Sequence, residues 1–451
     1  MRIEIAAEEV VTTYEPPNNG AGPLWCYGSP TIVRDGETVF CSVPETMAGA
    51  KPLCNTRWQL FMRRDGKAGL TRVQAGPGPE EREPCPLARL AGGRILLSVN
   101  PKARYLETWS TGESWACQPR LLQFDAGRLD QAPLALEPAW DQPYQFTEHS
   151  YRGIAADSQS GEILLLNIVG HKGQAWSFMD HSGAWTRNGM IRFPLRACYP
   201  QVALAERAAY VMAVSDIVEP NLAWRAHKQR VTGNYWDYDF RQLYFTWTPD
   251  IATTPFSPIL TVASVDETCG HIRNLDLWIG PDGDAHMLWL ERNVWHAFMR
   301  DAFFPNLPIT VALKYARARH GEIIERATLA HSTEAPSART TSETIAPAPG
   351  ATADAPMSSP RPTWAAFHAI DPEQALVIYH LSDEGGQAGG CYLKPLLPTP
   401  QPAQKIELAH RLSAFFTATT RNGTLPSPVI DLFGVSETPN EIRYAQIRLA
   451  G

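Results

Sequence analysis

The chain has 451 residues, a formal net charge of −7 and a sequence pI near 6.0. This acidic balance argues against nucleic acid as a partner. Hydrophobic residues make up 44% of the chain, and no apolar run approaches the roughly 18 residues of a membrane span. The first residues, Met1 to Ile5, lack the apolar core of a signal peptide. We therefore expect a globular cytoplasmic protein, or a secreted one if a leader was trimmed.

A repeated unit organises the chain from end to end. Each copy is a short apolar strand, a turn rich in Gly, Asp or Asn, and a second apolar strand. The copies span residues 29–43, 85–99, 149–167, 199–214, 275–289, 363–379 and 429–447. Seven such hairpins predict an all-β chain folded as a β-propeller, with seven blades of four antiparallel strands. Six or eight blades also fit the spacing.

Residues 1–451 are expected to form a single propeller domain, and Met1 to Val11 is expected to add an outer strand to the last blade. Two segments interrupt the repeat. Thr333 to Arg361 is rich in Ala, Pro, Ser and Thr, which predicts a flexible loop between blades. Ile217 to Phe240 is dense in Trp, Tyr, Arg, Lys and Asp, which is typical of a long functional loop.

Candidate catalytic residues follow from the blade geometry. The innermost strand of a blade begins at the face where the second strand ends, so reactive side chains at those positions converge near the axis. The stretch Phe146 to Arg152 places an acid, an imidazole, a phenol and a guanidinium at such a strand start. Histidine and tyrosine are acid–base groups, and arginine and aspartate stabilise or carry charge. The candidate catalytic residues are His149, Tyr151, Arg152, Tyr199 and Asp216.

Candidate substrate-binding residues occupy the same face or the loop at 217–240. Arginines can grip a carboxylate through two hydrogen bonds, aromatic rings can stack on sugars, and paired carboxylates can serve a hydrolase. The same groups can also be ordinary salt bridges and loop packing. The set comprises Trp25, Glu45, Glu148, Glu219, Arg225, Lys228, Trp236, Asp237, Asp239, Arg241, His271 and Arg273.

The eight cysteines form no C-x-x-C pair, and the histidines show no ligand spacing, so we expect no metal and no cofactor. Free buried thiols are the expected state of the cysteines, although an even number leaves disulfides open. No Gly-rich nucleotide loop, G-x-S-x-G or H-E-x-x-H motif occurs.

The pattern resembles the BNR-repeat and sialidase-like propellers among carbohydrate-active enzymes. It is most similar to seven-bladed lyases of uronic-acid polysaccharides, such as ulvan lyases and rhamnose-glucuronate lyases. The resemblance rests on Glu148-His149-Ser150-Tyr151 and Cys198-Tyr199-Pro200 at the starts of consecutive blades. It implies β-elimination by a His and a Tyr, with an Arg neutralising the uronate. This chain departs from that pattern at Val214-Ser215-Asp216, where the family has an arginine, so Arg225 or Arg273 would have to substitute.

Three functions therefore remain open. The first is a lyase acting on a uronate-containing oligosaccharide or polysaccharide. The second is a glycoside hydrolase that uses two of Asp216, Glu219, Asp237 and Asp239. The third is a propeller that binds a glycan or a protein without catalysis.

Overall fold

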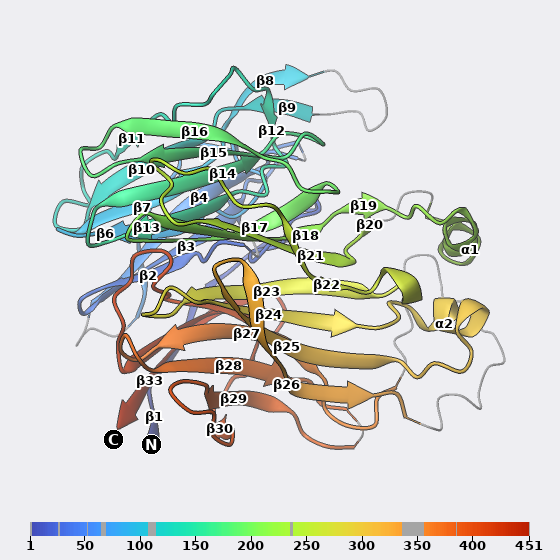
Figure 1. Cartoon of the computed structure of the whole chain (residues 1–451). Coiled ribbons are helices and arrows are strands. Elements are labelled where there is room, and N and C mark those ends of the chain that lie inside the picture. The colour runs from blue at the N-terminus through green and yellow to red at the C-terminus, as the bar shows by residue number, and fades with distance from the viewer. Residues whose placement is uncertain are drawn as a thin grey trace.

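The computed structural model describes residues 2–25, 28–51, 53–64, 69–106, 114–234, 238–335, 356–384 and 386–450. Within these ranges the chain forms seven four-stranded antiparallel sheets, which are the blades of a β-propeller (Figure 1). The innermost strands are β2 (Ile32–Asp35), β6 (Leu87–Leu90), β13 (Gly153–Asp157), β17 (Ala197–Ala205), β23 (His271–Ile279), β27 (Pro362–Ala369) and β31 (Leu412–Thr417). The second strands are β3 (Thr38–Thr46), β7 (Arg94–Val99), β14 (Glu162–Ile168), β18 (Ala208–Ser215), β24 (Ala285–Arg292), β28 (Ala375–Leu381) and β32 (Val429–Ser436).

The outer half of each blade is shorter or more exposed. The third strands are β4 (Thr56–Arg64), β10 (Arg120–Asp125), β15 (Gln174–Met179), β21 (Gln242–Thr248), β25 (Thr310–Arg319), β29 (Gly390–Pro395) and β33 (Glu441–Ala450). The outermost strands are β5 (Thr71–Ala75), β11 (Leu134–Leu136), β16 (Trp185–Ile191), β22 (Leu260–Ser264), β26 (Glu322–Thr333), β30 (Gln404–Ile406) and β1 (Arg2–Thr13).

The blades close into a ring. Each innermost strand contacts the next, in the order β2, β6, β13, β17, β23, β27, β31 and back to β2. Strand β13, for example, contains the continuous apolar run Gly-Ile-Ala-Ala, because both of its faces are buried against neighbouring blades. The predicted all-β propeller of seven four-stranded blades is confirmed.

The last blade contains both ends of the chain. Strand β1 pairs antiparallel with β33 from Arg2↔Ala450 to Thr13↔Glu441, as predicted for the N-terminal residues. The seventh hairpin of the sequence pattern was assigned to the wrong strands, however. Residues 429–447 form β32 and β33, the second and third strands of this blade, and the innermost strand is β31.

The two faces of the ring differ. One face, called here the insertion face, carries every insertion between a second and a third strand, and these project together in Figure 1. The inserted elements are β8 (Lys102–Leu106), β9 (Ser114–Cys117), β19 (Ile217–Val218), α1 (Leu222–Thr232), β20 (Tyr238–Asp239) and α2 (Ala297–Phe303). Strand β12 (Phe146–Thr147) and the 3₁₀ turn Asp266–Thr268 belong to interblade connections on the same side. The opposite face, called here the hairpin face, carries the turns between first and second strands.

The predicted interblade loop at 333–361 falls mostly on residues 336–355, which lie outside the described residues. Its described ends meet at a β-bridge between Glu334 and Met357.

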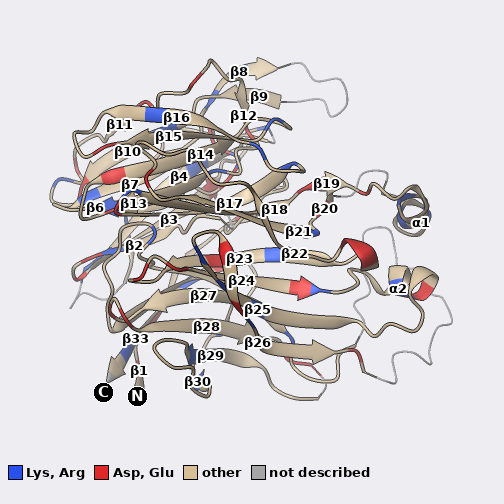
Figure 2. Ribbon diagram, in the orientation of Figure 1, with Lys and Arg blue, Asp and Glu red and all other residues tan. Residues whose placement is uncertain are grey.

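Lys and Arg are interspersed with Asp and Glu along the ribbon, as Figure 2 shows.

Residues 419–424, called here the axial segment, lie across the centre of the ring. Asn422 donates from its side chain to the carbonyls of Ile32 (2.9 Å) and Leu87 (3.2 Å) in two different blades. The buried Arg421 donates to the carboxylate of Asp276 in β23 at 3.0 Å. Gly423 has φ +88°, and an added Cβ would meet the Arg89 carbonyl at 1.9 Å, so only glycine fits there. The axial segment therefore joins several innermost strands across the axis.

Candidate functional site

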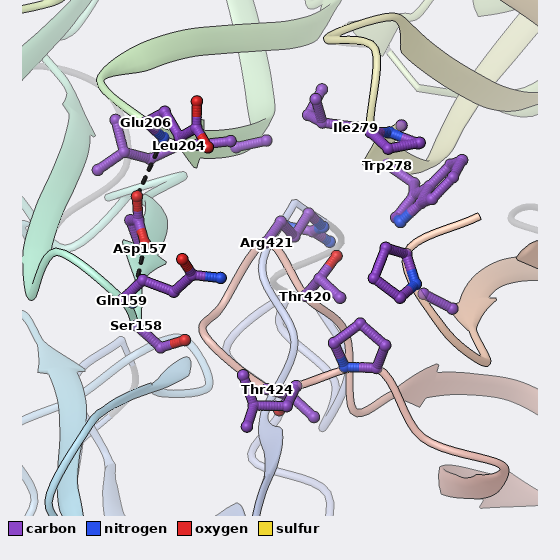
Figure 3. A pocket seen from close by; sticks show the side chains of 18 of the residues that line it. Asp157, Ser158, Gln159, Leu204, Glu206, Trp278, Ile279, Thr420, Arg421 and Thr424 are labelled. Atoms are coloured by element: carbon purple, nitrogen blue, oxygen red, sulfur yellow. Dashed lines mark hydrogen bonds between the residues drawn. The ribbon is translucent and has the colours of Figure 1, made fainter. Parts of the chain in front are cut away.

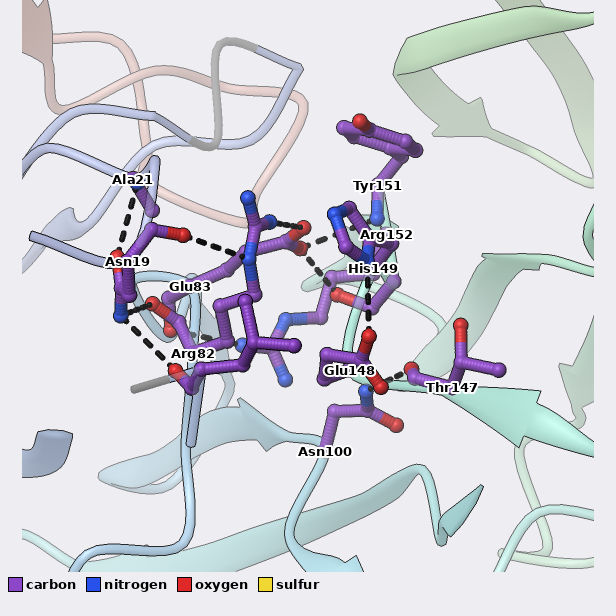
Figure 4. Close-up of polar contacts among 12 residues, drawn as sticks. Asn19, Ala21, Arg82, Glu83, Asn100, Thr147, Glu148, His149, Tyr151 and Arg152 are labelled. Carbon is purple, nitrogen blue, oxygen red and sulfur yellow. Dashed lines mark hydrogen bonds and ion pairs between the residues drawn. The ribbon is translucent and has the colours of Figure 1, made fainter. Parts of the chain in front are cut away.

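The Glu148–His149 pair lies on the insertion face, directly after β12 (Figure 4). Strand β9 holds the buried Glu148, because the Ser114 hydroxyl (3.0 Å) and the Trp115 amide (2.8 Å) donate to its carboxylate. The Nδ1 atom of His149 lies 3.0 Å from the other carboxylate oxygen. Burial acts to raise the pKa of Glu148, but the hydrogen bonds from His149 and Trp115 outweigh it and lower that pKa.

An ionised Glu148 fixes the tautomer of His149. The carboxylate only accepts, so Nδ1 carries the hydrogen and Nε2 is left as a basic nitrogen. The His149 side chain is 39% exposed. The pair therefore presents an oriented imidazole base at the surface.

Blade 2, the sheet that contains β6, anchors the residues that follow His149. Glu83 accepts hydrogen bonds from the Ser150 hydroxyl (2.5 Å) and the Tyr151 amide (3.1 Å). Arg152 is 1% exposed and donates to Glu81 (3.2 Å) and to the Glu83 carbonyl (3.1 Å). Figure 4 shows this network beneath His149 and Tyr151. The guanidinium of Arg152 is therefore hydrogen-bonded inside the protein. It holds this stretch in position and does not face solvent.

Tyr151 and Tyr199 share an uncommon backbone conformation at the starts of consecutive innermost strands. Their φ angles are +34° and +50°, which is rare for aromatic residues and is the kind of strain that clusters at functional sites. The rings meet edge to face, with centroids 4.8 Å apart. Tyr199 is 4% exposed, whereas Tyr151 is half-buried. Burial, with Cys198 and Asp216 nearby, raises the pKa of Tyr151, so its phenol stays protonated at neutral pH.

Arg196 and Asp216 form an ion pair beside Tyr151. Arg196 precedes β17 and Asp216 follows β18, and the ladder pairs their neighbours Ala197 and Ser215. The Cζ atom of Arg196 lies 5.3 Å from the centroid of the Tyr151 ring. Burial raises the pKa of Asp216, and Arg196 opposes that shift. Arg196 was not among the predicted site residues, although its place at a strand start was a signal that could have found it.

A chain of aromatic rings crosses the insertion face from the third to the fifth blade. It is called here the ring band, and its further members are Trp25, Phe240, His271 and Trp295. Successive centroid distances are 6.0 Å from Tyr199 to Phe240, 5.4 Å from Phe240 to His271 and 3.8 Å from His271 to Trp295. Trp25 packs on Tyr199 at 5.9 Å. Most of these rings are partly exposed, so they offer flat apolar surface to a ligand.

Four of the predicted binding residues form a buried ionic cluster beneath α1: Glu219, Lys228, Asp239 and Arg241. Lys228 lies 2.7 Å from Asp239 and 3.2 Å from Glu219, and Arg241 pairs with both acids. All four are at most 3% exposed, and their charges cancel. Burial raises the pKa of Asp239 to about 6. These side chains face one another, so they stabilise the fold of the segment at 217–240.

The other predicted residues are dispersed. Glu45 accepts from Arg57 at 2.5 Å and from Gln59 at 2.8 Å, at a distance along the ring from His149. Arg225 is half-buried on α1. Trp236 and Asp237 lie outside the described residues. Among the described residues, no three His, Cys, Asp or Glu side chains converge as metal ligands would.

Arg273 and His271 line a cavity of about 240 Å³ on the insertion face, between the fifth and sixth blades. A second cavity, of about 250 Å³, opens on the hairpin face (Figure 3). In that view Asp157 and Gln159 lie on one side, Trp278 lies on the other, and Arg421 of the axial segment lies between them. The axial segment is therefore one wall of the hairpin-face cavity.

No protein-family model matches the chain, and no curated protein matches it either. Solved structures do show the fold. A lectin of Burkholderia pseudomallei has a TM-score of 0.51 at 8% identity, over 94% of this chain and 97% of that one. A Dyadobacter fermentans protein of unknown function has a TM-score of 0.46 at 10% identity, over 99% of both chains. A Penicillium chrysogenum α-L-arabinanase complexed with arabinobiose has 0.40 at 10% identity, over 98% of both chains.

At such low identity the similarity concerns the propeller fold alone. In the described part of the chain, no helix has the length and apolarity needed to cross a membrane.

Proposed function

We propose that this protein is a carbohydrate-active enzyme that cleaves a uronic-acid-containing glycan by β-elimination on the insertion face. The observation that carries the proposal is the oriented pair: Nδ1 of His149 lies 3.0 Å from the Glu148 carboxylate, and the His149 side chain is 39% exposed. The Tyr151 phenol lies beside it, with ring centroids 6.1 Å apart. An imidazole base and a protonated phenol at this separation suit removal of a proton and protonation of a leaving oxygen.

In the proposed reaction, Nε2 of His149 takes the proton from C5 of the uronate. The electron pair of the C5–H bond forms the C4–C5 double bond, and the C4–O bond to the leaving sugar breaks. The Tyr151 phenol donates its proton to that leaving oxygen, and the proton held by His149 then passes through water to restore the phenol. Negative charge develops on the uronate carboxylate during the first step. Arg196, which is paired with Asp216 and lies 5.3 Å from the Tyr151 ring, is the cation beside this pair.

The carboxylates favour elimination over hydrolysis. A hydrolase needs two carboxyl groups that reach the glycosidic bond from opposite sides. Of the four acids considered, Glu219 and Asp239 are buried in the ionic cluster and Asp216 is paired with Arg196. Asp237 lies outside the described residues. Hydrolysis is therefore the less supported of the two reactions.

A second candidate function is glycan binding without catalysis. The ring band favours it, because stacking on flat apolar surface requires no acid or base. The Burkholderia protein with the same fold is named as a lectin.

The test is an incubation of the purified protein with a panel of uronate polysaccharides. Elimination yields an unsaturated uronate that absorbs in the ultraviolet, whereas hydrolysis yields reducing ends without that absorbance. We expect the absorbing product and a loss of about 10²–10⁴-fold in kcat for His149→Ala. His181→Ala is the matched control, because His181 is an exposed histidine on the hairpin face.

Three results would count against the proposal. Full activity in His149→Ala would remove the assigned base. Reducing ends without ultraviolet absorbance would select the hydrolase. Binding without either product would select the non-catalytic propeller.

A further inference from the structure

Two cysteines from different blades meet on the insertion face. The seven described cysteines are free, buried thiols. Cys54 precedes β4 in the first blade, the sheet that contains β2, and Cys117 is the last residue of β9. The two residues are far apart in the sequence, yet their thiols hydrogen-bond to each other. We call these two residues the thiol pair.

Backbone and side-chain contacts hold the two segments of the thiol pair together. Lys102 lies opposite Cys117 in the ladder of β8 and β9, and its Nζ donates to the Cys54 carbonyl at 3.4 Å. The Lys102 amide donates to the Glu80 carbonyl at 2.9 Å, and the Glu80 amide donates to the Thr56 carbonyl at 3.0 Å. Lys102 therefore joins the strand of one cysteine to the segment of the other, and the contact between the thiols follows from this packing.

Both thiols are protected from reagents in the closed structure. Cys54 is 1% exposed and Cys117 is 6% exposed, so Cys117 is the first of the two that a reagent in solvent meets. The hydrogen bond with Cys54 and burial both raise the pKa of Cys117. Its thiol therefore stays protonated at neutral pH, and the thiolate rather than the thiol is the nucleophile in disulfide exchange. Reaction of the pair thus requires β9 to open.

Strand β9 is placed where such an opening costs little. It belongs to the three-stranded sheet β12-β9-β8, which stands outside the seven blades (Figure 1). Its ladder with β12 is two residue pairs long, and one of these pairs is Cys117 with Phe146. The Cys117 thiol donates to the Trp115 carbonyl of the same strand at 3.7 Å. A short ladder outside the blades opens with less free energy than the core of a blade does.

We propose that Cys54 and Cys117 are a redox-active dithiol, which a small disulfide oxidant converts to a disulfide that ties β9 to the first blade. The thiolate of one cysteine attacks the S–S bond of the oxidant, forms a mixed disulfide and releases one thiol. The other cysteine then attacks the mixed disulfide, forms the Cys54–Cys117 bond and releases a second thiol. Two electrons pass to the oxidant, and the two protons lost by the cysteines end on the released thiols.

The disulfide acts on the strand that supports the Glu148–His149 pair. Strand β9 donates the Ser114 hydroxyl and the Trp115 amide to the Glu148 carboxylate. A bond across the thiol pair removes open conformations of β9, so these donors are released less often. Formation of the disulfide does not rest on the proposed function, whereas any effect on catalysis does.

The first experiment maps the bond in the full chain. The native protein is incubated with oxidised glutathione, the remaining thiols are alkylated, and tryptic peptides are identified by mass spectrometry. We expect the peptide of residues 105–120 to be joined to the peptide of residues 35–57, and dithiothreitol to separate them. Cys54→Ala and Cys117→Ala should each abolish the joined peptide. Cys41→Ala is the matched control, because Cys41 lies in the same tryptic peptide as Cys54.

The second experiment measures the opening of β9 by amide hydrogen exchange in the reduced and the oxidised protein. We expect residues 114–117 to exchange at least about tenfold more slowly after oxidation, because the bond removes the local opening that exposes them. Strand β16, the outermost strand of the third blade, is the control and should exchange equally in the two states.

Three results would overturn the inference. The first is that both thiols stay free in the native protein while the same oxidant reacts with the urea-unfolded chain. The second is that each cysteine carries glutathione without a bond between them. The third is equal exchange of β9 in the two states, which would remove its role as a tether.

The ultraviolet assay separates this inference from the proposed function. A mapped disulfide in a protein that gives no unsaturated uronate supports the thiol pair and contradicts the lyase. Formation of the absorbing product by a protein whose two thiols stay free under the oxidant supports the lyase and contradicts the thiol pair.

Discussion

Two groups of charged residues on the insertion face differ in how much of them is exposed. The cluster of Glu219, Lys228, Asp239 and Arg241 turns every charge inward, and each member is at most 3% exposed. The Glu148–His149 pair buries its carboxylate but leaves the imidazole 39% exposed. Residue types alone do not distinguish them, since both combine acids with basic groups. The difference is whether a reactive atom remains at the surface after the partners are satisfied.

Lys228→Met should have the largest effect, and it tests whether the buried cluster stabilises the fold. Removing the amine leaves Glu219 and Asp239 with one cation, Arg241, in a buried site. Breaking a buried ion pair in this way costs about 3–5 kcal/mol of unfolding free energy. Denaturant unfolding measures the loss, with Lys172→Met at an exposed position as control. Equal stability of the two variants would show that the cluster does not stabilise the fold.

Glu148→Gln tests the Glu148–His149 pair. We expect about tenfold or greater loss of kcat, because a hydrogen bond involving a charge contributes about 1.5–3 kcal/mol. A loss of unfolding free energy in Glu148→Gln large enough to account for the lower rate would mean that Glu148 acts only through the fold.

The pH dependence of the unfolding free energy is a second test of the buried cluster. Burial raises the pKa of Asp239 to about 6, above the ordinary value of 3.8. The folded protein therefore holds this proton more tightly than the unfolded chain does. The stabilisation that comes from protonated Asp239 is complete below about pH 4. The unfolding free energy then declines as pH rises towards 6, by roughly 1.4 kcal/mol per pH unit at most. Unfolding of the wild type and Asp239→Asn across this range should diverge accordingly, and parallel curves would contradict the assignment.

Ser114→Ala should have the smallest effect. It removes one donor, at 3.0 Å, from the Glu148 carboxylate and leaves the Trp115 amide in place. A single hydrogen bond contributes about 1 kcal/mol, which predicts a few-fold loss of kcat with nearly unchanged stability. A loss as large as that of Glu148→Gln would mean that β9 as a whole, rather than the carboxylate, orients His149.

The fold was predictable because six of the seven hairpins have tight turns between apolar strands. The seventh was misassigned for a physical reason. Between β31 and β32 the chain makes no tight turn but forms the axial segment, which is polar and bonded across the ring. The visible hairpin of that blade is β32–β33, so the sequence pattern pointed there.

The site was only partly predictable. The sequence pattern places His149 and Tyr151 at one strand start, and the structure brings their rings to 6.1 Å between centroids. Pairings across blades, by contrast, are invisible in one sequence. Arg152 occupies the same strand start as His149, yet it turns inward to Glu81 because blade 2 supplies an acid there. The pairing of Arg196 with Asp216 depends on the register of β17 and β18. The role of each predicted residue in a reaction remains a prediction.

The axial segment has a consequence for the shape of any substrate. Its bonds to Ile32, Leu87 and Asp276 tie strands on different sides of the ring together through the centre. Under the proposed function, a glycan would therefore lie across the insertion face and would not pass through the ring. Substrate would reach His149, and product would leave it, on that same face.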